Sequence, residues 1–363
     1  AIYDNYGNVI AEASDTGATG NATVSQWLAS VNTKMNTYYG TTGVEYAKIS
    51  NGVISVNGGY IKGDLASAIG LTTTSTVSGK ALVGNAIQIK ENSKFIGQVT
   101  DQTIPEGGQR VGDVSSFTAG ETYYLSDYGD ITRLAYLVNT GIDTSNVTFV
   151  MTNDIDMSSV SNFEGIGIFK GTFLGNGYEI KNLKIKGTDS YFGLFIGLNG
   201  ANIKDLGLSN VTLSTTYDKN EPLYAGSLAA ISNQSTIENC YVSGGRIAAT
   251  NKSSTYSRDG YIGGLVGTSQ DSTINNSYST VEVIANVNTT NSTGTFVGGF
   301  IGNIGQNATI TNSYATGNVT QNGIGRAGGF VGNIMSNAGV IDNCYAMGNV
   351  KSTNSTTNNE VGG

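Results

Sequence analysis

The chain has 363 residues, with 19 Lys and Arg against 27 Asp and Glu, so its formal net charge at pH 7 is −8. That charge, without a basic patch interleaved with aromatic residues, argues against nucleic-acid binding. Histidine is absent, which excludes a His-Glu-x-x-His zinc protease, a Ser-His-Asp triad and a Cys-His pair within these residues. No apolar run approaches the ~20 residues that a membrane-spanning helix needs.

The composition favours a stacked β structure in an exported protein. Charged residues make up only 13% of the chain, glycine contributes 51 residues, and 38% is hydrophobic, which is enough to bury a core. Two cysteines are too few for a disulfide framework. The chain starts at Ala1 without Met, which suits a product whose secretory signal has been removed, although a trimmed fragment would look the same.

Residues 1–120 are predicted to form a small α+β domain, whose family the sequence does not identify. Thr23-Val-Ser-Gln26 has the form of a capping box, and apolar residues follow it at helical spacing. An amphipathic helix is therefore expected from about 23 to 38, with Trp27 as a core residue. Asn51-Gly52, between two alternating apolar runs, predicts a β-hairpin because both turn positions need positive φ. Further strands are expected at 81–83, 87–89 and 95–99.

A second short helix is predicted at about 130–139, opened by Ser126 or Asp127 and ended by Gly141. It is expected to cap a solenoid, whose first rung would otherwise expose apolar atoms and unpaired backbone groups. The first strand of that solenoid is expected at 147–151. The predicted domain boundary therefore lies between residues 120 and 121.

A repeated unit fills the rest of the chain. In one copy Gly298-Gly-Phe-Ile-Gly302 precedes Ile310-Thr-Asn-Ser-Tyr-Ala315 and then Gly317-Asn-Val-Thr320. The second glycine of the first motif recurs at 193, 226, 264, 299, 329 and 363, a period of roughly 30 to 38 residues that is typical of solenoids. The last copy is cut off at Gly363, so the natural protein is expected to continue beyond it.

The three apolar runs in each unit are short, rich in β-branched and aromatic residues, and separated by Gly, Asn and Ser. Runs of that kind predict three strands per turn of a right-handed parallel β-helix over residues 121–363. A helical solenoid of similar period is disfavoured, because Gly, Thr and Asn occupy positions that need helix formers. The polar spacers 250–258, 285–294 and 321–326 are expected to protrude as loops at one corner.

These motifs resemble the GLUG-motif repeat of bacterial surface proteins. That repeat occurs in large filamentous-haemagglutinin-like adhesins and in the non-catalytic region of IgA-cleaving surface metallopeptidases. The lead-in through residues 134–139, 152–157 and 169–183 also resembles the opening of that solenoid, so the resemblance covers about residues 127–363. It implies a mostly β chain with a parallel β-helix and an extracellular or cell-surface location.

Two columns of repeat positions are candidate sites. Stacked rungs would place the amides of one column about 4.8 Å apart, close enough for hydrogen bonds along the axis, as a structural ladder. The ladder residues are Asn239, Asn276, Asn312 and Asn343, with Asp205 in the first copy. The next-but-one position is aromatic and predicted to point outward, where it would hold sugar rings or a partner protein, or simply stack on itself. Its residues are Tyr241, Tyr278, Tyr314 and Tyr345.

Asp154 and Asp156 are the weak candidates for a metal or acid–base site. Two residues apart in a strand, they share a face, and paired carboxylates bind Ca²⁺ or serve sugar chemistry. The resemblance instead makes them part of the opening rung of the scaffold, a structural role. Cys240 and Cys344 are predicted to remain free, because three rungs would separate them by about 14 Å, beyond the reach of a disulfide.

The sequence therefore predicts a non-enzymatic exported protein without cofactors, either an adhesin stalk or the subunit of an extracellular fibre. Expected partners are a host or cell-surface glycan or protein, or neighbouring subunits of a fibre. The alternative is the scaffold of a carbohydrate-active β-helix enzyme or the accessory region of a surface peptidase. A clustered acidic groove would favour the enzyme scaffold, and a zinc motif beyond Gly363 would favour the peptidase.

Overall fold

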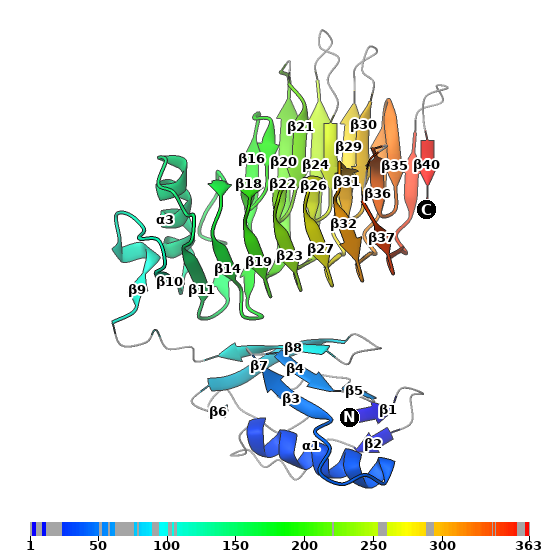
Figure 1. The fold of residues 1–363 in the computed structure, drawn as a ribbon. Helices are drawn as coiled ribbons and strands as arrows, with labels where there is room; N and C mark the ends of the chain where they lie inside the picture. Colours follow the sequence, from blue (N-terminus) through cyan, green and yellow to red (C-terminus); the bar gives the residue numbers. More distant parts are fainter. Residues whose placement is uncertain are drawn as a thin grey trace. The chain divides into compact units, whose positions relative to one another are not determined.

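In the computed structural model the chain forms two compact units (Figure 1). The first comprises Ala1–Glu106 and is assigned Asn176–Tyr178 as well, and the second comprises Gly107–Gly175 and Glu179–Gly363. The described residues are 2–4, 9–11, 24–50, 53–56, 59–61, 76–77, 80–88, 94–100, 104, 107–219, 221–252, 260–287, 294–335, 337, 339–353 and 360–362. Before residue 104, side chains are described only for Ile10 and residues 28–48. Among the described residues, no helix combines the length and apolar character needed to cross a membrane.

The first unit combines one helix with two antiparallel sheets. Helix α1 (Val24–Tyr39) confirms the predicted helix and buries Leu28, Val31 and Met35; Thr23 and the Trp27 side chain lie outside the described part. One sheet has the order β2-β1-β5 and the other β3-β4-β8-β7-β6. Their bounds are β1 (Ile2–Asp4), β2 (Val9–Ala11), β3 (Ala47–Ser50), β4 (Val53–Val56), β5 (Gly59–Ile61), β6 (Thr76–Val77), β7 (Lys80–Gln88) and β8 (Lys94–Thr100).

The predicted hairpin is confirmed, since β3 and β4 pair antiparallel with Ser50 opposite Val53. The turn residues Asn51 and Gly52 themselves lie outside the described part. Strand β3 lies at a sheet edge, and the Asn32 side chain from α1 satisfies the backbone there. The Asn32 amide donates to the Ala47 carbonyl at 2.7 Å, and its oxygen accepts from the Ala47 N–H at 2.6 Å. A side chain thus replaces the missing neighbouring strand.

The second unit begins earlier than the predicted boundary at residue 120. Strands β9 (Gln109–Arg110) and β10 (Thr122–Leu125), joined through the 3₁₀ turn η2 (Val111–Asp113), already belong to the parallel sheet that continues into β11 (Thr148–Met151). Residues 107–121 carry no repeat motif, so this extra rung could not be predicted from the repeats. Helix α3 (Tyr128–Asn139) then caps the solenoid as predicted, with Asp127 as its N-cap and Ile131, Leu134 and Val138 buried.

The solenoid consists of four parallel sheets, named here sheets I to IV. Sheet I contains β9, β10, β11, β14 (Thr172–Leu174), β19 (Asn202–Lys204), β23 (Thr236–Glu238), β27 (Thr273–Asn275), β32 (Thr309–Thr311) and β37 (Ile341–Asp342). Sheet II contains β12 (Ile155–Asp156), β15 (Glu179–Lys181), β16 (Lys184–Gly187), β20 (Gly207–Tyr217), β24 (Tyr241–Asn251), β28 (Tyr278–Ser279), β29 (Glu282–Val287), β33 (Tyr314–Ala315), β34 (Val319–Asn322), β38 (Tyr345–Ala346) and β39 (Val350–Ser352).

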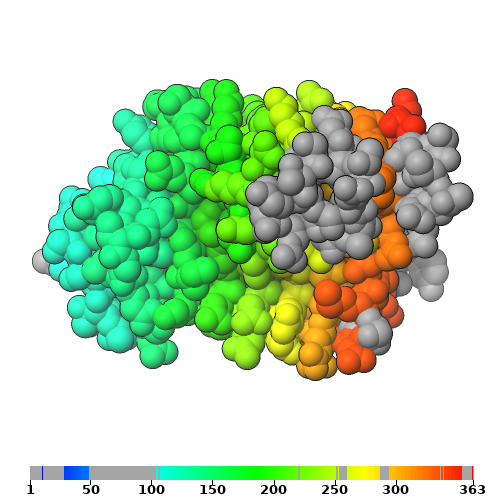
Figure 2. All heavy atoms as spheres, turned by 90° about the horizontal axis from the view of Figure 1, so that it is seen from above, coloured from blue at the N-terminus to red at the C-terminus, as the bar shows by residue number. Residues whose placement is uncertain are grey.

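Sheet III contains β13 (Ile166–Phe169), β18 (Phe195–Asn199), β22 (Ala229–Asn233), β26 (Val266–Gln270), β31 (Ile301–Ile304) and β36 (Val331–Ile334). Sheet IV contains β17 (Tyr191–Phe192), β21 (Leu223–Gly226), β25 (Gly260–Gly263), β30 (Thr295–Gly298), β35 (Gly325–Gly328) and β40 (Glu360–Gly362). The chain visits sheets IV, III, I and II once per repeat. Viewed from above, the successive rungs form bands of colour along the solenoid (Figure 2).

The prediction of three strands per turn was therefore wrong. The Gly-Gly-x-x-Gly motif does not form one strand; the chain folds back within it and passes from one sheet to the next. It ends β30 in sheet IV and opens β31 in sheet III. A Cβ on Gly298 would lie 2.0 Å from the Ile301 carbonyl oxygen, and one on Gly302 would lie 2.4 Å from the Ile262 nitrogen of the preceding rung. The two sheets thus approach backbone to backbone, at a distance that no residue with a Cβ permits.

The predicted loops are partly corrected. The first two fall mainly on residues outside the described part, but β29 extends to Val287, so the second begins later than Ala285. The third, predicted at 321–326, is only the turn between β34 and β35. Gly323 and Gly325, both at positive φ, permit that tight turn.

Apolar residues at recurring positions form two interior columns. Leu265 and Phe300 are fully buried, Phe330 is 9% exposed, and the rings of Phe300 and Phe330 stack with centroids 4.7 Å apart. Ile274 and Ile310 pair in the second column and are fully buried. Ile341 continues that column but is 39% exposed, because it lies on the last rung.

The cysteines lie in a third column and are not bonded to each other. The Cys240 N–H donates to the Ser277 hydroxyl, and the Ser277 N–H donates to Ser313, which precedes Cys344 in the column. Burial raises the pKa of both thiols, most strongly that of the fully buried Cys240. Because the thiolate is the reactive form, both are slow nucleophiles at neutral pH.

Replacement of Phe300 by Ala is expected to lower the free energy of unfolding by about 3–5 kcal/mol, because the close-packed column cannot collapse around the cavity. Ile168, which is 55% exposed, supplies the control, and Ile168→Ala is expected to change stability by no more than about 0.5 kcal/mol. Urea denaturation followed by circular dichroism measures both. Equal effects of the two substitutions would contradict the assigned column.

The thiols provide a second test of the one-repeat-per-rung stacking. A thiol-reactive chromophore is expected to label half-buried Cys344 before Cys240 in the folded protein, since the Cys240 thiol is fully buried. Denaturation should expose both thiols equally, with the same count with or without reductant. An intramolecular Cys240–Cys344 bond would contradict the stacking of one repeat per rung.

Candidate functional site

The tyrosine positions form a continuous column on sheet II. Tyr241, Tyr278, Tyr314 and Tyr345 occupy the same register in β24, β28, β33 and β38. Successive ring centroids are 5.0, 4.9 and 5.1 Å apart, with interplanar angles of only 3 to 6°. The residues on either side of Tyr241, Cys240 and Val242, are fully buried, so the tyrosines point away from the core. We call this column the tyrosine strip.

Stacking determines which part of each ring the strip presents. Each inner ring has neighbouring rings above and below, so its two faces are covered and its edge and hydroxyl are directed outward. The two end rings each have a neighbouring ring on one side alone: Tyr345, on the last rung and 51% exposed, and Tyr241, which has Gly207 at the preceding register position. A sugar ring laid flat on an aromatic face therefore has no place along the inner strip. The geometry instead offers a row of phenol hydroxyls and electropositive ring edges.

The phenols of Tyr241, Tyr278 and Tyr314 remain protonated at neutral pH. Burial raises the pKa of Tyr241 and Tyr278, and it raises the pKa of Tyr314 to about 12. The neighbouring phenols, and Glu179 beside Tyr241, raise these values further because a phenolate would face additional negative charge. Each of these three hydroxyls thus keeps its proton as a hydrogen-bond donor.

The N-terminal end of the strip is anchored on Glu179. The Tyr241 hydroxyl donates to Glu179 Oε1 at 2.8 Å, and the Ser209 hydroxyl donates to Oε2 at 3.0 Å. Between them in the register stands Gly207, and a Cβ there would lie 2.5 Å from the Tyr241 ring. Tyr241 therefore leans over the glycine to reach the carboxylate one rung further on.

The asparagine column borders the strip, and its residues turn a corner of each rung. Asn239, Asn276, Asn312 and Asn343 all have φ between 50 and 54°, the left-handed region that Asn tolerates best after Gly. Their side chains also bond along the axis. Asn239 donates to Asp205 at 2.8 Å, Asn276 donates to Asn239, and Asn343 donates to Asn312 at 2.6 Å. The run shifts once, because Asn312 donates to Asn275 rather than to Asn276.

Asp154 and Asp156 both flank the buried Ile155, but each has its own structural partners. Asp154 accepts from the Glu179 N–H at 2.9 Å and pairs with the Lys181 ammonium at 2.5 Å. Asp156 accepts from the Asn182 amide at 2.9 Å and from the Ser158 N–H at 2.8 Å, and these bonds lower the pKa of Asp156. Among the described residues, no group of three or more His, Cys, Asp or Glu side chains is placed to hold a metal ion.

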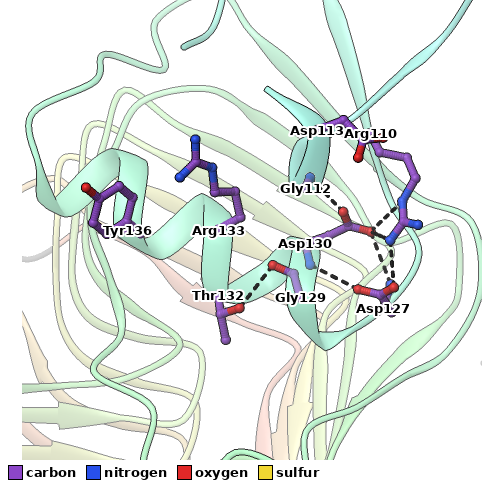
Figure 3. Close-up of a pocket in the computed structure, with 9 residues that line it drawn as sticks. All are labelled: Arg110, Gly112, Asp113, Asp127, Gly129, Asp130, Thr132, Arg133 and Tyr136. Atoms are coloured by element: carbon purple, nitrogen blue, oxygen red, sulfur yellow. Dashed lines mark hydrogen bonds and ion pairs between the residues drawn. The ribbon is translucent and has the colours of Figure 1, made fainter. Parts of the chain in front are cut away.

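The sequence did not indicate a shallow pocket of about 460 Å³ at the capping helix (Figure 3). Its centre is Asp130, fully buried, which accepts from Gly112 N–H and Ser126 N–H at 2.8 and 2.7 Å. Arg110 bridges Asp130 and Asp127 at 2.8 and 2.6 Å. The close-up shows these side chains turned toward one another. The arrangement ties β9 to the start of α3, so we assign it to stability. The capping pair Asp127 and Asp130 was the available sequence signal.

A second aromatic column, on sheet IV, was also missed. Its rings are those of Tyr191, Tyr224, Tyr261 and Phe296, stacked with centroids 5.3 to 5.4 Å apart. The Arg326 guanidinium continues it, 5.4 Å from the Phe296 ring centroid. A sequence signal for this column was present, because an aromatic residue stands two positions before a glycine in Tyr224-Ala-Gly, Tyr261-Ile-Gly and Phe296-Val-Gly.

Residues 259–284 and 293–320 match the family model described as the GLUG motif, which confirms the resemblance drawn from the repeats. A crystal structure from Bacteroides ovatus, described as a "putative immunoglobulin A1 protease", is similar at 18% identity, covering 70% of this chain and 88% of that chain, with a TM-score of 0.46. No curated protein matches the chain.

Replacement of Gly207 by Ala tests how the strip is anchored. The added Cβ would meet the Tyr241 ring at 2.5 Å and the Glu179 side chain at 2.9 Å. Because Tyr241 is held in its stack, we expect a loss of about 1–3 kcal/mol in the free energy of unfolding. Ser214→Ala, at an exposed position of the same strand, should change it by no more than about 0.5 kcal/mol. Chemical denaturation compares them, and an unaffected Gly207→Ala variant would refute the assigned position of Tyr241.

Proposed function

We propose that the chain is a non-enzymatic exported surface protein, either an adhesin stalk or a subunit of an extracellular fibre. In this role the solenoid is a stiff scaffold, and its outward columns and loops are the attachment surface. GLUG-type repeats in residues 259–284 and 293–320 support the surface setting, since the motif resembles that of bacterial surface proteins. In this role the protein acts by presenting these surfaces for attachment rather than by catalysing a reaction.

The observation that carries this proposal is that the candidate Asp154, and the carboxylates of Asp130 and Glu179, are engaged in structural contacts. Asp154 is paired with Lys181, Asp130 is bound by Arg110 and two backbone N–H groups, and Glu179 accepts from Tyr241 and Ser209. A general acid or base needs a proton-transfer position that is open to its substrate. These carboxylates instead hold neighbouring rungs together.

The purified chain is therefore expected to show no turnover of polysaccharides or peptides, with or without added Ca²⁺ or Zn²⁺. Product release is measured by chromatography over a long incubation at high protein concentration. Asp154→Asn and Asp156→Asn are the informative variants. Reproducible cleavage that either substitution abolishes would overturn the proposal in favour of a carbohydrate-active scaffold.

A further inference from the structure

We propose that the tyrosine strip binds a neutral, extended polysaccharide that lies parallel to the solenoid axis, with one sugar residue per rung. This inference rests on the proposed attachment function and names the chemical class of its ligand. It assigns recognition to the hydroxyls and edges of the strip, rather than to ring faces.

The strip offers hydrogen-bonding groups that the protein leaves unused. Tyr241 donates to Glu179, whereas the hydroxyls of Tyr278, Tyr314 and Tyr345 have no hydrogen-bond partner among the described residues. Each phenol provides one donor and also accepts. A row of such groups suits a ligand that carries hydroxyl and ring oxygens along its whole length.

Amide groups border this row on one side. A carboxamide has two N–H donors and an oxygen with two lone pairs, and the ladder bond to the preceding rung uses one donor of each asparagine. Asn312 and Asn343 are exposed, so their second donors reach solvent. Aromatic hydroxyls beside primary amides form an alternating surface of donors and acceptors, which matches the vicinal hydroxyls of a sugar.

Hydroxyl side chains follow the first three tyrosines on the other side. Ser243, Thr280 and Thr316 stand two residues after Tyr241, Tyr278 and Tyr314, respectively, and all three are partly exposed. Thr280 accepts from the Gly244 N–H at 2.7 Å, which fixes its orientation while its own proton remains available. Each central rung thus repeats the same set of amide, phenol and hydroxyl groups.

The repeat distance selects a linear ligand. The ring centroids recur at 4.9 to 5.1 Å. Parallel rungs lie about 4.8 Å apart, so the strip suits a linear glycan whose sugar residues advance by a similar distance. A glycan along the axis therefore meets equivalent groups at successive sugars, and its affinity rises with length until the strip is filled.

The charges around the strip favour a neutral ligand. The tyrosines of the strip and the amide and hydroxyl side chains beside them are uncharged, whereas the carboxylates of Glu179, Glu238 and Asp342 stand at its end or beside its asparagines. Lys181 and Lys204, on the rungs before the strip, are engaged by Asp154 and Glu238. A polyanion along the strip would meet the like charge of these carboxylates, so acidic polysaccharides are disfavoured.

Isothermal titration calorimetry with neutral hexasaccharides tests this site. Cellohexaose, laminarihexaose, maltohexaose and mannohexaose are the probes, with the matching disaccharides and hexagalacturonate as comparisons. We expect at least one neutral hexasaccharide to bind, its disaccharide to bind at least tenfold more weakly, and hexagalacturonate not to compete. The absence of binding by all four, or equal binding of disaccharide and hexasaccharide, overturns the inference.

The variant Tyr278→Phe/Tyr314→Phe removes two hydroxyls and keeps both rings in the stack. It should weaken the hexasaccharide at least tenfold, with the thermal midpoint unchanged. Tyr191→Phe, in the sheet IV column, is the matched control and should bind normally. If the double variant proves unstable, Tyr345→Phe on the exposed last rung gives the same comparison. Unchanged affinity in a folded strip variant overturns the assignment.

Two further outcomes separate this inference from the function on which it rests. Chromatography of the titrated oligosaccharide should return it intact, and cleavage would overturn the non-enzymatic function itself. Failure to bind, with the oligosaccharide intact, overturns only the glycan site. Sedimentation velocity tests whether a second copy of the chain binds this surface instead. Self-association that the double variant abolishes, without glycan binding, would assign the strip to a second copy of the chain.

Discussion

The solenoid depends on the close approach of sheets III and IV, where only hydrogen atoms separate two backbones. At Gly298 and Gly302 even a methyl group would lie within 2.0 to 2.4 Å of neighbouring backbone atoms. The equivalent Gly263 and Gly267 are similarly tight, at 2.0 and 2.5 Å. This fold-back turns each repeat through four sheets instead of three. It also brings the residue in the middle of the motif, such as Phe300, into the buried column.

Because every repeat folds back at the same point, equivalent residues lie directly above one another. Phenylalanine then meets phenylalanine, tyrosine meets tyrosine, and asparagine meets asparagine along the axis. Such columns are favourable inside the core, where identical apolar side chains fill space, and at corners, where amides satisfy one another. On the surface the same stacking covers aromatic faces and leaves edges outward. The chemistry available to a ligand is thus a consequence of the rung geometry.

The sequence predicted the parallel β-helix and its capping helix but not the path of the chain between the sheets. The strand at Ile310 was predicted because its motif recurs, and α3 was predicted from capping residues and helical spacing. The fold-back at Gly298 was missed, since a short apolar run does not indicate which sheet its two halves join. The outward direction of Tyr278 followed from alternation, whereas the covering of its faces depends on ring orientation. The bridge from Arg110 to Asp130 spans residues without periodicity, so no pattern could indicate it.

Like-with-like stacking has a consequence for how such a chain finds its alignment. If one rung paired with the next rung but one, most column contacts would be recreated, so the repeats alone discriminate weakly between correct and slipped arrangements. The irregular start of the second unit has no such duplicate. Its buried Asp130 is satisfied only by Arg110 and the backbone around η2 and α3, a set that occurs once. The bonds to that carboxylate therefore favour the correctly aligned start of the solenoid over a slipped one.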